Sequence, residues 1–96
     1  MTDVAEALER LRARFRARAA ADLTDLRQWS TDPGAHQDDL HALVHRLAGA
    51  AGTFGYDRLS HLAARAEDAL ITDAADRTMA IADVIDELER VSETGA

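Results

Sequence analysis

The feature that most constrains this chain is how rarely its sequence interrupts a helix. Its 96 residues contain one proline and five glycines, and residues 3–29 contain neither. Glycine and proline are the residues that helix interiors tolerate least, whereas alanine, which is abundant here, is the strongest helix former. Aromatic residues make up only 4% of the chain, which disfavours a strand-rich fold. The composition therefore predicts an all-α protein.

Apolar residues recur every three or four positions in four segments, the spacing of an amphipathic helix. The expected helices cover residues 3–29, 36–54, 56–71 and 73–92. The stripe expected to be buried in the first helix comprises Val4, Leu8, Leu11, Phe15, Ala19, Leu23 and Leu26. Four such helices joined by short turns bury their stripes most simply as an antiparallel up-down four-helix bundle. We therefore expect a single domain over residues 1–96.

Turn-forming and capping residues mark the boundaries of these helices. Residues 30–34 read Ser-Thr-Asp-Pro-Gly, the strongest turn signal in the chain. Gly55 is expected to stop the second helix by adopting a left-handed conformation, as glycine often does at that position. Thr72 and Asp73 are expected to cap the N-terminus of the fourth helix.

The charge is negative overall but unevenly distributed. The formal net charge of −7 argues against nucleic acid as a partner. Residues 1–18 carry five arginines against three acidic residues, a net charge of +2, which leaves −9 on the rest of the chain. We expect the arginine stems to lie along the edges of the buried stripe. Contact with an acidic partner or anionic lipid is the alternative.

Several classes of protein are disfavoured by what the sequence lacks. No stretch reaches the ~20 apolar residues of a membrane span, and the N-terminus lacks the basic flank and apolar core of a signal peptide. There is no cysteine, which excludes disulfides and thiolate metal sites and fits a reducing compartment. There is no phosphate-binding glycine loop and no hydrolase-like Ser/His/Asp spacing. We expect a cytoplasmic protein without membrane contact and without kinase machinery.

His45 is the side chain whose surroundings are hardest to explain by packing. The apolar residues that define the core side of its helix are Leu40, Leu43, Leu47, Ala51 and Phe54. On a wheel of about 100° per residue, His45 lies roughly opposite them, together with Gly49 and Gly52. Ala48 lies at the edge of this face and His41 one turn earlier. Each internal glycine costs about 1 kcal/mol relative to alanine, so this face serves something other than helix stability.

An exposed imidazole with only small residues beside it is suited to covalent chemistry. The neutral ring is a nucleophile that can hold a phosphoryl group through a P–N bond. In-line transfer to or from a carboxylate of another protein requires close approach, which small neighbours such as Gly49 permit.

The segment from His45 to Glu67 resembles the histidine phosphotransfer (HPt) domain family. The matching pattern is a histidine, Leu47 two residues later, Gly49 four later and Gly55 ten later, then a leucine- and alanine-rich helix ending at Glu67. The resemblance covers the second and third expected helices, whereas the first and fourth match only in length and amphipathicity. It implies a four-helix bundle that carries phosphoryl groups between aspartates of receiver domains.

The resemblance also implies roles and partners. His45 would accept the phosphoryl group and Gly49 would clear its approach, with His41, Ala48 and Gly52 on the surrounding docking face. The implied partners are response-regulator receiver domains or a hybrid histidine kinase. We expect a monomeric phosphocarrier with no metal or cofactor of its own, since any Mg²⁺ would be held in the acidic pocket of the receiver.

One position departs from the family pattern. Members often carry a lysine three residues after the histidine, where this chain has Ala48, and the chain contains no lysine at all. The possible phosphate-charge partners in its place are Arg46, Arg58 and Arg65. Two other interpretations stay open: a helical adaptor that binds a receiver without transfer, and a metal- or cofactor-binding bundle that uses His41 and His45 as ligands.

Overall fold

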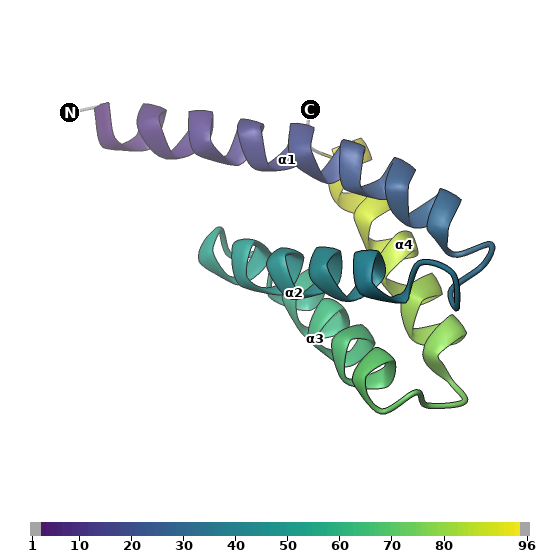
Figure 1. The fold of residues 1–96 in the computed structure, drawn as a ribbon. Coiled ribbons are helices and arrows are strands. Elements are labelled where there is room, and N and C mark those ends of the chain that lie inside the picture. The colour runs from purple at the N-terminus through teal and green to yellow at the C-terminus, as the bar shows by residue number, and fades with distance from the viewer. Residues whose placement is uncertain (1–2, 95–96) are drawn as a thin grey trace.

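Four α-helices make up the part of the chain that the computed structural model describes, residues 3–94. The helices are α1 (Asp3–Trp29), α2 (Gln37–Thr53), α3 (Asp57–Ile71) and α4 (Arg77–Thr94) (Figure 1). Residues 3–94 contain no strand, and the expected all-α four-helix bundle is confirmed. The expected domain of residues 1–96 extends at both ends beyond the described residues.

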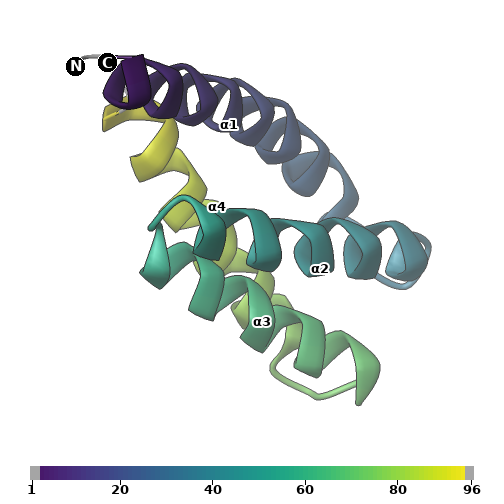
Figure 2. The same ribbon diagram turned by 90° about the vertical axis from the view of Figure 1, so that its left-hand side faces the viewer.

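The helices pack unequally. α2 and α3 form the most extensive pair, α4 packs against both α3 and α1, and α1 touches α2 only lightly. Figures 1 and 2 show α1 on one side of the α2–α3 hairpin, with α4 running from near the end of α3 to α1. Alanines that are fully buried, including Ala51, Ala63 and Ala66, lie in this core. Small side chains at a contact let helix axes approach closely.

The core is aliphatic and continuous through all four helices. Its largest fully buried apolar side chains are Leu26, Leu40, Leu47, Leu59, Leu70, Ile81, Leu88, Val44 and Val84. Each helix presents these residues on one face only, as the spacing predicts. Within the described residues, none of the helices has the combination of length and apolar character that crossing a membrane requires.

The turn between α2 and α3 is closed by Gly55, which has φ +84°. The N–H of Tyr56 donates to the carbonyl of Ala51 at 2.8 Å, and the N–H of Gly55 donates to that of Gly52 at 3.3 Å. This pair of bonds is a Schellman motif, which satisfies carbonyls at the end of a helix and needs a left-handed residue. The chain therefore reverses sharply, so that α3 returns along α2.

The start of α4 differs from the expectation. It begins at Arg77, four residues after the expected residue 73, because Asp73 belongs to the end of α3. Asp73 has φ 52°, its N–H donates to the carbonyl of Leu70, and the N–H of Ala74 donates to that of Ala69. Aspartate tolerates the left-handed conformation better than most residues, and its carboxylate pairs with Arg77. Thr72 and Asp73 thus end one helix rather than cap the next.

The buried stripe expected along α1 is only half correct. Phe15, Ala19, Leu23 and Leu26 are buried, but Val4, Leu8 and Leu11 are 81%, 40% and 44% exposed. At about 1.5 Å per residue, the 27 residues of α1 make it far longer than its 15- to 18-residue neighbours. Figure 1 shows its first turns extending beyond the α2–α3 turn. The first half of α1 therefore has no helix to pack against.

Aromatic rings fix the point where α1 begins to pack. Phe15 stacks on Tyr56, with ring centroids 4.9 Å apart, and contacts Phe54 at 5.7 Å. The neighbouring Arg16 donates to the carboxylate of Glu9 at 3.1 Å, and its interactions with Tyr56 and Glu9 raise the pKa of Arg16. This aromatic cluster links α1 to the α2–α3 turn.

Candidate functional site

His45 lies in the middle of α2, on the side facing away from the core. Val44, beside it in sequence, and Leu47, two residues later, are fully buried, and the rotation of the helix turns His45 outward. Its side chain is 71% exposed. The imidazole is therefore accessible to another molecule.

Glu67 on α3 fixes one side of this imidazole. Its Oε2 lies 2.6 Å from Nδ1 of His45, and the Glu67 side chain is only 20% exposed. An ionised carboxylate can only accept, so Nδ1 of His45 is assigned the proton and donates it. In the neutral ring the lone pair is then on Nε2, the nitrogen directed away from Glu67.

The hairpin explains how two residues so distant in sequence meet. His45 lies ten positions before Gly55 and Glu67 lies twelve after it. Positions at similar distances from the turn of an antiparallel hairpin lie at similar heights along its two helices. In the sequence, Glu67 was interpreted only as the end of the third helix, so this contact was not predicted. The nearly symmetrical spacing of His45 and Glu67 about Gly55 was a signal for it.

His41 reaches the same carboxylate from one turn earlier in α2. Its Nε2 lies 3.3 Å from Oε2 of Glu67, and its ring stacks on that of His45 with centroids 6.2 Å apart. The Nε2 atom is shielded from solvent, and its contact with Glu67 is close enough for an ion pair but lacks hydrogen-bond geometry. The structure thus brings His41, His45 and Glu67 together.

The small residues near His45 differ in their surroundings. A Cβ atom built on Gly49 would meet nothing within 4 Å, whereas one on Gly52 would lie 3.2 Å from Oγ of Ser60. The hydroxyl of Ser60 donates to the carbonyl of Ala48 at 2.7 Å. Gly49 therefore opens the surface, while Gly52 also makes room for α3.

Two of the three arginines considered as phosphate-charge partners are engaged elsewhere. Arg46 makes two hydrogen bonds, of 3.1 and 3.3 Å, to the carboxylate of Asp22 on α1. Asp22 is only 1% exposed. Arg58 pairs with Glu87 on α4 at 3.3 Å. The side chain of Arg65 is exposed and makes no ion pair or hydrogen bond within the described range.

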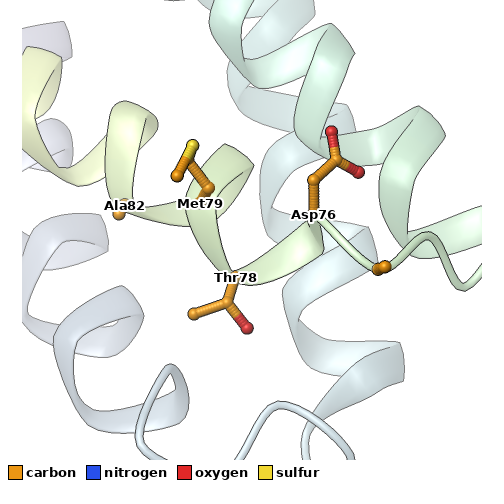
Figure 3. A pocket seen from close by; sticks show the side chains of 5 residues that line it. Asp76, Thr78, Met79 and Ala82 are labelled. Atoms are coloured by element: carbon orange, nitrogen blue, oxygen red, sulfur yellow. The ribbon is translucent and has the colours of Figure 1, made fainter.

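A metal site and an apolar depression are two alternatives to a site at His45 within the described residues. None of their His, Asp and Glu side chains form a group of three or more that could hold a metal ion. A shallow depression of about 580 Å³ lies at the start of α4, lined by Ala75, Asp76, Thr78, Met79 and Ala82 (Figure 3). Apart from Asp76 this lining is small or apolar, so the depression offers no nucleophile to match His45.

The structure is a helical bundle with an exposed histidine, the arrangement that the resemblance to HPt domains led us to expect, and a carboxylate supports that histidine. The Hpt domain family model matches residues 3–94, so the chain belongs to the Hpt domain family. The match includes α1 and α4, which in the sequence resembled the family only in length and amphipathicity. Comparison with curated proteins and with solved structures gives no match. Membership supports a phosphotransfer role in two-component signalling, with interaction with receiver domains or histidine kinases.

Proposed function

We propose that this chain relays a phosphoryl group between receiver-domain aspartates through Nε2 of His45. The observation that carries the proposal is the geometry of one side chain. The imidazole of His45 is 71% exposed, and its Nδ1 is 2.6 Å from Oε2 of Glu67. Beside it, the backbone at Gly49 is open.

In the proposed transfer, Nε2 of His45 attacks the phosphorus of an aspartyl phosphate. The N–P bond forms as the bond between phosphorus and the aspartate oxygen breaks, and the aspartate leaves as a carboxylate. The ring gains positive charge while Nδ1 keeps its proton, and the carboxylate of Glu67 stabilises that charge where it develops. Transfer to the next receiver is the same reaction in reverse.

Steric access is the second part of the proposal. A receiver must bring its carboxylate within a few ångströms of His45, in line with the bond that breaks. Gly49 leaves space on the same face of α2, and we propose that His41, Ala48 and Gly52 belong to the surface that the receiver contacts.

The phosphoryl charge needs a cation, and within the described residues two of the three candidate arginines are engaged elsewhere. Ala48 occupies the position of the family lysine, and the guanidinium groups of Arg46 and Arg58 are paired with Asp22 and Glu87. We propose that the neutralising charge comes mainly from Mg²⁺ in the receiver's acidic pocket. The chain then acts as a monomeric, cytoplasmic, stoichiometric carrier without a cofactor.

The test is incubation with a phosphorylated receiver domain. The chain should acquire a phosphoryl label that is labile in acid and stable in alkali. His45→Gln should abolish the label while leaving the helical circular dichroism unchanged, because His45 is exposed. His36→Gln is the matched control and should label normally. Labelling of the His45→Gln variant at the wild-type rate would refute the proposal.

A second substitution tests access separately from chemistry. Gly49→Leu keeps His45 and Glu67 but places a bulky side chain in the open space beside them. Transfer from a receiver should fall at least about a hundredfold, which corresponds to ~2.7 kcal/mol, while the helix content is retained. Normal transfer by this variant would show that the open backbone has no steric role.

Ala48 favours one competing function, a helical adaptor that binds a receiver without accepting phosphate. Such an adaptor would bind the receiver equally well before and after His45→Gln and would take no label. The same labelling experiment therefore separates the carrier from the adaptor.

A further inference from the structure

The carboxylate of Glu67 is shared by two imidazoles. Its Oε2 lies 2.6 Å from Nδ1 of His45 and 3.3 Å from Nε2 of His41. Among the described residues, the Glu67 carboxylate makes no other ion pair or hydrogen bond. Its orientation towards His45 therefore depends on these two contacts.

The protonation of His41 is constrained by this arrangement. Its Nε2 is shielded from solvent, and the acceptor that it faces is the carboxylate of Glu67. A bare lone pair on that nitrogen would oppose the lone pairs of the carboxylate and would leave a buried polar atom unsatisfied, which is costly. A proton on Nε2 of His41 turns the same contact into an attraction.

We propose that His41 is a positioning residue that acts through Glu67. With a proton on Nε2, His41 holds the carboxylate of Glu67 against Nδ1 of His45, and this contact selects the His45 tautomer with its lone pair on Nε2. This inference rests on the proposed function for its consequence, the rate of transfer. The arrangement itself can be measured without any partner protein.

Sharing also couples the two rings. When His41 carries a single proton, on Nε2, the negative charge of Glu67 is available to stabilise the charge that develops on His45. When His41 takes up a second proton, its positive charge neutralises Glu67 and repels a positive His45 at a ring separation of 6.2 Å.

Several other charged groups around α2 are engaged away from His41. On α1, Asp22 binds Arg46 and Arg18. At the start of α2, His36 lies near Asp39. Glu67 on α3 and His45 on α2 are thus the titratable groups in direct contact with His41 within the described residues.

The test compares His41→Phe with His41→Gln by long-range ¹H–¹⁵N correlation spectra of the isolated, ¹⁵N-labelled protein. Phenylalanine keeps a ring but cannot donate, whereas glutamine can donate to Glu67. The proton on Nδ1 of His45 should predominate in the wild type and in His41→Gln and should be lost in His41→Phe. His61→Gln, which changes an exposed histidine of α3, is the control and should resemble the wild type.

The same variants make a further prediction about transfer. Transfer from a receiver should slow about tenfold in His41→Phe, because Glu67 loses a contact that orients it towards His45, and stay within about threefold in His41→Gln.

An unchanged His45 tautomer in a folded His41→Phe would overturn the proposal. If that variant does not fold, loss of the Nδ1 proton of His45 in His41→Gln would overturn it instead. The spectra require neither receiver nor phosphate. Failure of a receiver to label His45 would therefore count against the proposed function and not against this arrangement.

Discussion

The α2–α3 hairpin and the first half of α1 carry equally regular apolar spacing, yet they pack in opposite ways. Leu47 and Leu59 of the hairpin are almost fully buried, whereas Leu8 and Leu11 of α1 are 40% and 44% exposed. The hairpin helices lie against each other along their length, while α1 extends beyond the point where its neighbours end (Figure 1). The spacing fixes which face of a helix can be buried, and the length of the neighbouring helices decides how much of it is buried.

The same contrast explains where the candidate site lies. Two hydrogen bonds join the helices of the hairpin. Near the turn, the hydroxyl of Ser60 donates to the carbonyl of Ala48, and near the open end the amide of Gln37 donates to the carbonyl of Leu70. Between these bonds, Glu67 can be held within 2.6 Å of His45. A site that needs two side chains at a fixed separation requires this kind of rigid support.

The largest difference between the two regions should appear in stability. Leu47→Ala should lower the free energy of unfolding by about 2–5 kcal/mol, because it empties a filled position in the core. Leu8→Ala should change it by less than about 0.5 kcal/mol, since the side chain is exposed. Denaturant unfolding of both variants measures the contrast, and similar losses for the two would show that the first half of α1 is packed in solution.

Within the hairpin, Glu67→Gln should slow transfer through His45 by about tenfold, because a charged acceptor for Nδ1 becomes a neutral one. The free energy of unfolding should change by no more than about 0.5 kcal/mol. Asp68→Asn, the adjacent exposed acid, is the control and should transfer at the wild-type rate. Transfer kinetics with a phosphorylated receiver measure both, and equal rates for the two variants would remove Glu67 from the mechanism.

Loss of the ion pair between Arg46 of the hairpin and Asp22 of α1 should have a smaller effect on stability. Arg46→Ala should destabilise the fold by about 1–2 kcal/mol, because it leaves the buried carboxylate of Asp22 with only Arg18. Arg58→Ala removes an ion pair whose arginine is 70% exposed and should cost less than about 1 kcal/mol. Thermal unfolding of the two variants distinguishes them. A larger loss for Arg58→Ala would contradict this account of the Arg46–Asp22 pair.

The smallest expected difference is between two glycines of α2. Gly49→Ala should stabilise the protein by up to about 1 kcal/mol, because alanine favours the helix and the added methyl group enters open space. Gly52→Ala should gain less, since its Cβ would lie 3.2 Å from Oγ of Ser60 and Ser60 would have to shift. Chemical denaturation measures both. A greater gain for Gly52→Ala would show that Ser60 moves at no cost.

Much of the fold could be predicted because it is encoded locally. The bounds of α1 to α3 agree with the expected helices to within one residue at each end, because the Pro33-Gly34 turn and Gly55 are strong signals for the end of a helix. The expected start of α4 was wrong because Asp73, which ends α3 in a left-handed conformation, has the same residue type as an N-cap. The buried stripe of α1 was half wrong because apolar spacing carries no information on the length of neighbouring helices.

The candidate site could be predicted only one helix at a time. The outward position of His45 and the open face beside Gly49 follow from the periodicity of α2 alone. The contacts of Glu67 with His45 and His41 depend on the register between two helices, which the turn geometry sets. The engagement of Arg46 by Asp22 depends similarly on where α1 crosses the hairpin.

The most direct test of the central claim is to identify the phosphorylated atom. The chain is labelled by a phosphorylated receiver, and ³¹P and ¹⁵N NMR spectra are recorded in alkaline solution. The proposed mechanism predicts a single phosphoramidate on Nε2 of His45, with Nδ1 still protonated and facing Glu67. A phosphoryl group on Nδ1 of His45, or on any other residue, would contradict it.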